Sequence, residues 1–495
     1  MLIPLTLLAL AAASPALAQD DTPKSKAKTE ESQGNDLPPL SVDRTVRQSA
    51  TIGGRQIAYE ATVGTIMVRD AKGKPIGQVV YTAYVVPGRD PARPVTFAFN
   101  GGPGASSVYL NLGAIGPKRV QFGAAGDAPS DAAVARDNPE SWLDFTDLVF
   151  IDPVGTGFSR SLIDEEATKK AFYSTEPDVK YLSRIVYDWL VKAERLRSPK
   201  YLVGESYGGY RAPRMAYELQ SQLGVGIAGI VMVSPYLDPA ATGDGTALSP
   251  LPWMIELPSM AAGHLERQGK LTPAAMAGVE AYVRGPYATD LLNGRSDPAA
   301  PARMAAKVAE LTGLDPVLVR RMGGRVDSRT YLREIRRDTG EIGSVYDSNV
   351  TAWDPFPFAA QQESNDPILD SLIAPTTSAM VDFITREAGW KTEARYNALS
   401  YAVNTAWDRG KPDDSPVKDL RKAVANDPKM GVLIVHGWGD LSCPYFASRL
   451  IVDQMPAFGQ AERVKLAIYP GGHMFYSRGA SAAAFKADAR ALYRR

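Results

Sequence analysis

Short apolar runs that end at glycine-bearing turns recur along this chain, and stretches with helical spacing lie between them. Six runs have the length and composition of buried strands: residues 94–100, 147–153, 201–203, 226–234, 430–436 and 464–469. Between residues 175 and 197, apolar side chains such as Val179, Leu182 and Val186 recur at a helical period. Because strands and helices alternate, the pattern predicts a mostly parallel sheet with crossover helices, which is an α/β fold.

The segment before the first of these runs has a different pattern. Residues 48–86 alternate between apolar and polar positions, with turn residues at Gly53–Gly54 and at 71–74. This alternation is typical of antiparallel hairpins. We expect these hairpins to form the leading edge of the sheet, in a structural role.

The alternation of strands and helices fades between about residues 239 and 425. Helix-prone, alanine- and arginine-rich stretches replace it, interrupted by Gly and Pro and carrying aromatics such as Trp253, Trp353, Phe356 and Trp390. We predict a mainly helical insertion that lies over the carboxyl edge of the sheet and shapes a substrate cleft; a separate non-catalytic domain is the alternative. The core then has two parts, 42–238 and 426–495, and a helix over 481–493 ends it.

The N-terminus predicts export. Residues 1–18 are apolar and end in Ala16-Leu17-Ala18, a small-x-small pattern typical of signal peptides, although the segment has no Lys or Arg; a buried first helix is the alternative. Residues 19–41 are almost entirely polar and predict a disordered leader. Cys443 is the only cysteine, so no intramolecular disulfide can form. We therefore expect an exported protein, periplasmic or secreted, of a bacterium.

Charge and hydropathy exclude some partners. The 55 basic and 55 acidic residues balance, which argues against a surface that binds nucleic acid. No segment after the N-terminus is apolar for long enough to span a membrane, so no stable membrane insertion is expected.

The stretch Gly204-Glu205-Ser206-Tyr207-Gly208 follows an apolar run and fits the pattern G-x-S-x-G. Small residues on both sides of the serine permit a sharp strand-to-helix turn that exposes its hydroxyl as a nucleophile. The turn also places the serine at a helix N-terminus, where N–H groups can stabilise an oxyanion. A chance match is the alternative, because five-residue patterns recur in long chains.

Partners for Ser206 lie downstream in the required order. Of the three histidines, His264 lies in the insertion and His436 in a strand, so both are expected to be structural. His473 follows the last strand, and Asp440 follows the strand before it. Ser206–Asp440–His473 is the order of an α/β-hydrolase triad, with His473 as base and Asp440 orienting it. We therefore predict an α/β-hydrolase.

A glycine-rich turn, residues 101–107, directly follows the first core strand. It lacks the lysine of a P-loop and the spacing of a dinucleotide site, so no cofactor or metal is predicted. Its N–H groups can instead point at a substrate oxyanion.

Four blocks of the chain resemble the serine carboxypeptidases of the S10 peptidase family. They are residues 100–107, 138–142 with 152–159, 204–209 and 471–474. The resemblance implies a serine carboxypeptidase that removes C-terminal residues from peptides through an acyl-enzyme on Ser206, without a cofactor. It also implies further site residues, which are an oxyanion hole from Gly102 and Tyr207, and a substrate site that includes Asn100, Gly101, Glu205 and Met474.

The role that the resemblance implies for Glu205 has a physical explanation. A carboxylate beside an anionic substrate terminus would repel it, but burial raises a carboxyl pKa and the neutral acid can donate a hydrogen bond. We therefore expect peptide binding to be favoured at acidic pH, until protonation of His473 removes the base. A structural residue of the turn is the alternative for Glu205.

The chain departs from the family pattern at four positions. Ala114 stands where a further glutamate of the carboxylate-binding network is common, and Ala105 replaces a cysteine of the glycine-rich loop. Trp438 stands where the family usually has an aspartate, two residues before Asp440. Tyr476 stands after His473 and Met474, where the family commonly has valine and proline. Cys443, in contrast, matches a family cysteine. These departures leave the triad intact but weaken the case for recognition of a terminal carboxylate. An esterase or acyltransferase of the same fold, or an inactive binding protein, are therefore the alternative functions.

Overall fold

The computed structural model describes residues 37–494, except for 89, 122–128, 240–248, 360–361, 365, 412–413 and 460. The predicted signal peptide and nearly all of the predicted leader lie outside the described residues. The chain from Pro38 to Arg495 is one compact unit, and the description that follows concerns it alone. Within the described residues, no helix is long and apolar enough to cross a bilayer.

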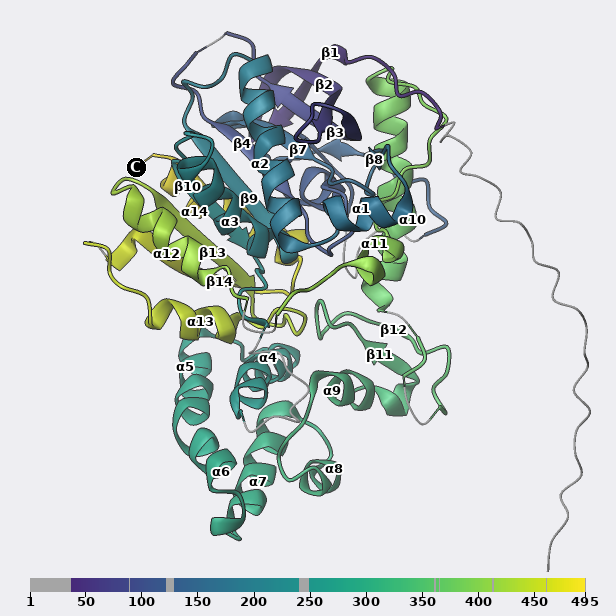
Figure 1. Ribbon diagram of the computed structural model, residues 1–495. Coiled ribbons are helices and arrows are strands. Elements are labelled where there is room, and N and C mark those ends of the chain that lie inside the picture. The colour runs from purple at the N-terminus through teal and green to yellow at the C-terminus, as the bar shows by residue number, and fades with distance from the viewer. Residues whose placement is uncertain are drawn as a thin grey trace, which may run out of the picture. The chain divides into compact units, whose positions relative to one another are not determined.

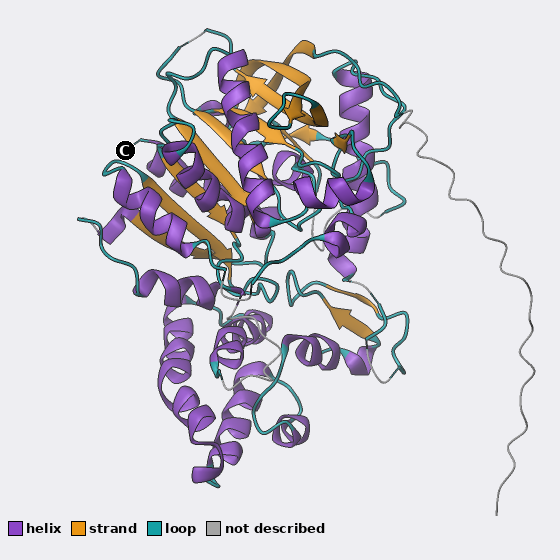
Figure 2. Ribbon diagram, viewed as in Figure 1, coloured by secondary structure: helices purple, strands orange, loops and turns teal. Residues whose placement is uncertain are grey.

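A mixed sheet forms the centre of this unit (Figures 1 and 2). Within the described residues it has ten strands, in the order β1-β2-β3-β7-β4-β9-β10-β13-β14, with β8 paired to β3. These strands are β1 Arg44–Ile52, β2 Arg55–Arg69, β3 Pro75–Val85, β4 Val95–Phe99, β7 Asp147–Ile151, β8 Arg160–Ser161, β9 Lys200–Glu205, β10 Gly229–Val233, β13 Gly431–Gly437 and β14 Val464–Tyr469.

The directions of the strands match the sequence patterns. β1, β2 and β3 pair antiparallel, as the alternating N-terminal segment predicts, and β3 also pairs antiparallel with β7. β7, β4, β9, β10, β13 and β14 pair parallel, as the strand–helix alternation predicts. The predicted α/β fold with a mostly parallel sheet and N-terminal antiparallel hairpins is therefore confirmed.

Both faces of the parallel strands are buried, because their side chains alternate between two cores. In β9, Leu202 packs in one core, while Tyr201 and Val203 pack in the other. The first core contains apolar faces of α2, α3 and α12, and the second those of α10 and α14. Such two-sided burial explains why these strands appear in the sequence as continuous apolar runs.

The helices that cover the sheet are α1 Glu165–Phe172, α2 Thr175–Lys192, α3 Tyr207–Ser221, α10 Pro367–Asp382, α11 Tyr401–Ala406, α12 Val417–Asn426, α13 Tyr445–Asp453 and α14 Gly479–Tyr493. In the predicted insertion lie α4 Leu251–Arg267, α5 Pro273–Tyr282, α6 Ala288–Asn293, α7 Ala300–Thr312, α8 Pro316–Arg321 and α9 Ser328–Glu334. Two short strands, β11 Glu341–Gly343 and β12 Thr351–Trp353, follow them, and β5 Lys118–Arg119 pairs with β6 Arg136–Asp137.

The region predicted as one insertion has two parts that pack differently. Helices α4 to α9 build a third core, around residues such as Met260, Met304 and Tyr331, which Tyr445 of α13 also joins. The following part, from α10 onward, joins the main core instead, where Phe383 and Trp390 are buried. Figure 1 shows α5 to α8 away from the sheet and α10 beside it. Only the first part is therefore a separate layer.

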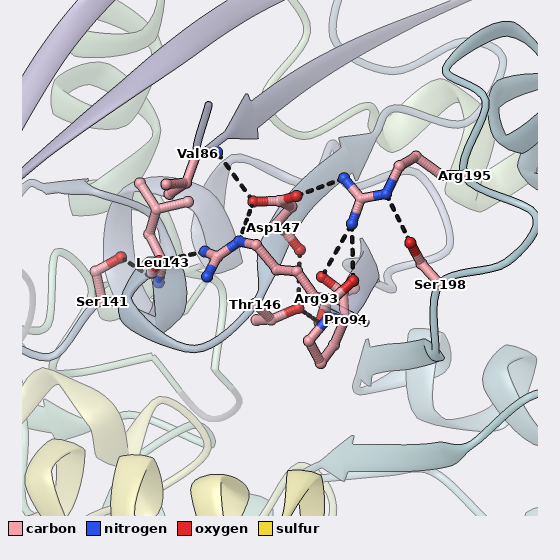
Figure 3. A network of polar contacts seen from close by, with 10 residues as sticks. Val86, Arg93, Pro94, Ser141, Leu143, Thr146, Asp147, Arg195 and Ser198 are labelled. Atoms are coloured by element: carbon pink, nitrogen blue, oxygen red, sulfur yellow. Dashed lines mark hydrogen bonds and ion pairs between the residues drawn. The ribbon is translucent and has the colours of Figure 1, made fainter. Parts of the chain in front are cut away.

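A buried ion-pair network fixes the strand ends opposite the candidate site (Figure 3). Asp147 begins β7, and its carboxylate accepts hydrogen bonds from Nε of Arg93 at 2.7 Å and from a terminal nitrogen of Arg195 at 2.5 Å. The backbone N–H of Val86 donates to the same carboxylate. Because Arg93 precedes β4 and Arg195 follows α2, the network ties β3, β4, β7 and α2 together.

Candidate active site

Ser206 lies on the turn between β9 and α3, as the G-x-S-x-G pattern predicts. Its backbone has φ 60° and ψ −121°, a strained conformation for a residue with a side chain. Its N–H donates to the carbonyl of Val233 on the neighbouring strand, at 2.9 Å. A Cβ on Gly208 would overlap the carbonyl oxygen of Phe99, so only glycine lets the helix start this close to β4.

The glycine-rich loop after β4 lies against the same turn. A Cβ on Gly101 would overlap the backbone nitrogen of Tyr207, and Gly102 has φ +96°, which favours glycine. Gly101, Gly102 and Tyr207 all line one cavity with Ser206. The loop and the helix N-terminus therefore bring backbone N–H groups near the serine, where a substrate oxyanion would form.

His473 and Asp440 form a buried pair. Nδ1 of His473 lies 2.9 Å from Oδ2 of Asp440, and the carboxylate is fixed by the backbone N–H groups of Ser442 and Cys443, each 2.9 Å from Oδ1. Burial alone would lower the pKa of His473, but the adjacent Asp440 carboxylate outweighs burial and raises that pKa. Because Asp440 occupies Nδ1, Nε2 is the nitrogen left to exchange a proton in the cavity.

Glu205, directly before the serine, is almost completely buried and both of its oxygens are held. The side-chain amide of Asn100 donates to Oε2 at 2.7 Å, and the hydroxyl of Tyr476 donates to Oε1 at 2.8 Å. Burial raises the pKa of Glu205 to about 6, although His473, Tyr476 and Asn100 each lower it. A carboxyl with this pKa is largely protonated in mildly acidic solution.

The orientation of the Asn100 amide follows from its second partner. Oδ1 of Asn100 accepts a hydrogen bond from the backbone N–H of Leu110 at 2.9 Å. Nδ2, which can only donate, must therefore face Glu205.

These side chains line a cavity of about 300 Å³. Eight of the nine predicted site residues line it, and the ninth, Asp440, lies behind His473. The eight residues that line the cavity are Asn100, Gly101, Gly102, Glu205, Ser206, Tyr207, His473 and Met474. The structure therefore brings together residues that are up to 374 positions apart, since Asn100 and Met474 share one wall.

Sequence reasoning missed several residues of the cavity wall. Tyr346, Leu369, Leu399 and Arg409 come from the predicted insertion, whereas none of the four aromatics quoted for it lines the cavity. Trp390 is buried in the main core, and Trp353 is mostly exposed. The insertion has no regular pattern that shows which side chains face the sheet, so the sequence carries no signal for Tyr346 or Arg409.

The insertion also holds the loop that carries His473. The carbonyl of Tyr346 accepts the backbone N–H of His473 at 2.5 Å, and the two rings meet edge to face with centroids 5.1 Å apart. Next to it, Asp347 accepts a hydrogen bond from Arg478 at 2.7 Å, and Arg478 also binds Glu266 of α4. The position of His473 therefore depends on the insertion.

The other two histidines lie elsewhere. His436 is buried in β13 beside Ser448, where burial lowers its pKa to about 3. His264 on α4 contacts Gln268. Among the described residues, no group of three His, Cys, Asp or Glu side chains is arranged to hold a metal.

The sheet, the serine on its strand-to-helix turn and the Asp440–His473 pair have the arrangement of the α/β-hydrolase fold. A crystal structure of a prohormone-processing carboxypeptidase, Kex1 from Saccharomyces cerevisiae, shares this fold with a TM-score of 0.55. That likeness covers 88% of this chain and 91% of the other, at 15% identity.

Residues 77–249 match the family model of the serine carboxypeptidases, peptidase S10. This match covers about a third of the chain. Over 172 residues it is 33% identical to the pheromone-processing carboxypeptidase KEX1 of Ogataea parapolymorpha, which covers 34% of this chain and 24% of that protein. Over 178 residues it is 31% identical to serine carboxypeptidase-like 36 of Arabidopsis thaliana, which covers 34% of each chain. The chain thus spans only about a quarter to a third of the length of these curated relatives.

Proposed function

We propose that this protein is a serine-type carboxypeptidase that hydrolyses the last peptide bond of peptides with a free C-terminus. The observation that carries the proposal is the placement of the Asn100–Glu205 pair beside Ser206, in a cavity that also contains His473. A serine hydrolase needs the nucleophile and the base, but only an exopeptidase needs a group that binds a terminal carboxylate at this distance from the serine.

In the proposed reaction, Oγ of Ser206 attacks the carbonyl carbon while Nε2 of His473 takes the hydroxyl proton. Asp440 holds the imidazole and stabilises its cation, as in other serine triads. The N–H groups of Gly102 and Tyr207 stabilise the oxyanion. The histidine then protonates the departing amine, and the C-terminal amino acid leaves. Water attacks the acyl-enzyme with His473 as base again, which releases the shortened peptide and restores Ser206.

Recognition of the terminal carboxylate gives the reaction its proposed pH dependence. Neutral Glu205 donates a hydrogen bond to the substrate carboxylate, while the ionised form repels it. Because the pKa of Glu205 is about 6, KM is lowest below that pH and rises above it. Protonation of His473 lowers kcat, and because Asp440 raises the pKa of this imidazole, that loss already acts in the pH range where Glu205 is neutral.

The test compares an N-acylated dipeptide with its C-terminal amide. We expect hydrolysis of the free acid, a much lower kcat/KM for the amide, and loss of both activities in Ser206→Ala. Glu205→Gln should make KM nearly independent of pH, since a glutamine donates at every pH. Equal rates for acid and amide, or faster cleavage of simple esters with transfer to alcohols, would instead support an esterase or acyltransferase.

A serine-directed fluorophosphonate separates these outcomes from an inactive protein. We expect it to label the wild type and not Ser206→Ala. Absence of labelling in a folded wild-type protein would contradict the proposed nucleophile.

A further inference from the structure

The hydroxyl of Tyr476 contacts the carboxyl group of Glu205, the residue directly before the nucleophile. Its side chain is buried, in the short helical turn Phe475–Ser477 that follows His473, and its hydroxyl donates to Oε1 of Glu205 at 2.8 Å. Tyr476 is one of the positions that depart from the family pattern, and it does not line the cavity. It reaches the substrate only through Glu205.

The two partners of Glu205 constrain where the proton of its neutral form can point. Asn100 and Tyr476 both donate to the carboxyl group, one to each oxygen. A neutral carboxylic acid has one O–H to donate, and neither of these partners presents an acceptor in this arrangement. The proton of Glu205 is therefore left to point at the cavity, where a substrate carboxylate can accept it.

We propose that Tyr476 is a positioning residue for substrate binding, whose hydroxyl holds Glu205 so that the neutral acid presents its proton to the terminal carboxylate of the peptide. This inference rests on the proposed function. It goes beyond that function because a residue outside the cavity wall, Tyr476, then sets the pH range over which the peptide binds.

The direction of the effect follows from the groups around Glu205. Asn100 and Tyr476 donate to it, while the charges of His473 and Asp440 act on it from the two loops behind. Loss of one donor destabilises the ionised carboxylate and so raises the pKa of Glu205. In Tyr476→Phe, the neutral, binding form should therefore persist to higher pH.

The experiment measures kcat and KM against pH for Tyr476→Phe with the N-acylated dipeptide. We expect KM to begin rising at a pH about one unit higher than in the wild type. One pH unit corresponds to the free energy of about one hydrogen bond to a charged group. Below that limb, kcat should equal that of the wild type, because no reacting atom touches Tyr476. An unmoved KM limb, or a lower kcat with an unchanged KM limb, would overturn the proposal.

Tyr469→Phe is a matched control. The hydroxyl of Tyr469 also donates to a carboxylate, Asp488, at 2.6 Å, but Tyr469 lies on β14 and not on the cavity wall. The same deletion of a carboxylate-bound hydroxyl should leave the KM limb in place. A similar shift in both variants would show that the effect is general and would contradict a specific role for Tyr476.

A binding measurement keeps the inference separate from the proposed reaction. Calorimetry on Ser206→Ala and on Ser206→Ala/Tyr476→Phe gives the Kd of the free-acid dipeptide at each pH without turnover. We expect the same upward shift of the pH limb of Kd. If the wild type hydrolyses no peptide but the shift occurs, the proposed function fails and the role of Tyr476 stands; if Kd does not depend on pH, the role of Tyr476 fails.

A second, independent observation concerns the charge of the cavity wall. Arg409 lines the cavity and is exposed, and among the described residues it has no acidic partner. Within the described ranges, its guanidinium donates only to Oδ1 of Asn404, at 3.1 Å. Asn404 in turn donates to the carbonyl of Pro103 in the glycine-rich loop, at 2.9 Å. The cavity thus has a cation that is tethered to the loop beside Ser206 and open to a ligand.

We infer that Arg409 selects peptides with an acidic side chain next to the scissile bond. This also rests on the proposed function, since Asn100 and Glu205 then hold the terminal carboxylate and leave Arg409 for a second one. A planar guanidinium suits a carboxylate, and partial exposure keeps the gain modest.

The test compares dipeptides with Glu and Gln at each position beside the scissile bond. We expect about fivefold higher kcat/KM for Glu at one position, a preference lost in Arg409→Gln. Arg395→Gln, an exposed arginine outside the cavity, should keep it. Equal rates for Glu and Gln in the wild type would overturn the inference. So would loss of the discrimination between free acid and amide in Arg409→Gln, because Arg409 would then bind the terminal carboxylate.

Discussion

Arg211 and Asp178 form an ion pair in which both side chains are almost completely buried, with Nε of Arg211 2.6 Å from Oδ2 of Asp178. The pair joins α3, one turn after Ser206, to α2. A terminal nitrogen of Arg211 also donates to the backbone carbonyl of Asn100 at 2.8 Å. The pair therefore fixes the backbone of Asn100, whose side-chain amide donates to Glu205.

We expect each single change of this pair, Arg211→Met or Asp178→Leu, to lower the free energy of unfolding by about 3–5 kcal/mol, because one buried charge loses its partner. The double variant Asp178→Leu/Arg211→Met should regain most of that loss, since neither charge then remains buried. Urea unfolding of the four proteins measures the coupling. Additive losses in the double variant would contradict a direct interaction.

The contact between Gly101 and Tyr207 gives a prediction about the oxyanion site. Gly101 does not have a positive φ, so alanine is compatible with its backbone, but the added Cβ would overlap the nitrogen of Tyr207. Gly101→Ala should therefore displace one N–H donor and reduce kcat by roughly 10²–10³-fold. Gly226→Ala is the control, because a Cβ at Gly226 meets no atom within 4 Å. Equal kcat values in the two variants would argue against the assigned donor.

Much of the fold could be predicted from the sequence, because its strands are buried on both faces. Such strands appear as continuous apolar runs, and their glycine-bearing ends place Ser206, Asp440 and His473 at one edge of the sheet. The order of the three residues predicts one shared site, and Ser206 and His473 line the same cavity.

The remaining parts of the site depend on tertiary packing that leaves no pattern in the sequence. Tyr476 lies three residues after His473, but the direction of its side chain is set by the turn Phe475–Ser477 and its packing. Tyr346 and Arg409 lie in irregular segments, where no period shows which side chains face the cavity. Trp390 is expected near the cleft only because it is an aromatic residue of the insertion. It packs in the main core instead, together with residues of α10.

Asp152 predicts how stability depends on pH. It is buried behind the glycine-rich loop, where the N–H of Ser107 donates to it at 2.8 Å, and burial raises its pKa to about 7. The folded state therefore binds more protons than the unfolded state between about pH 4 and pH 7. The stability from this group is complete below about pH 4 and is lost as the pH rises through 7.

Asp152→Asn removes this dependence, since an amide does not titrate. We expect the wild type to lose roughly 2–4 kcal/mol relative to the variant between pH 4 and pH 7.5. Urea unfolding of both proteins at a series of pH values measures the difference. Glu256, whose pKa is also raised to about 7, is present in both and cancels. A constant difference across this range would contradict a raised pKa for Asp152.

The contact between the insertion and His473 gives the last prediction. Asp347 binds Arg478, and the preceding carbonyl, of Tyr346, accepts the N–H of His473. Asp347→Ala removes one of the ion pairs of Arg478. The segment around Tyr346 and the loop that carries His473 then become less rigid, so the imidazole is less well placed relative to Ser206. Small errors in the position of a catalytic group are costly, and we expect kcat to fall roughly 10- to 100-fold with little change in KM.

Asp382→Ala tests whether any lost ion pair has this effect. Asp382, the last residue of α10, pairs with Arg386 of the next helical turn; both are exposed, and such pairs contribute little. We expect its kcat to match the wild type. Asp347→Asn, which keeps an oxygen for Arg478, should recover part of the lost kcat. If Asp347→Ala instead raises KM alone, the insertion shapes the binding of the substrate and does not position the base.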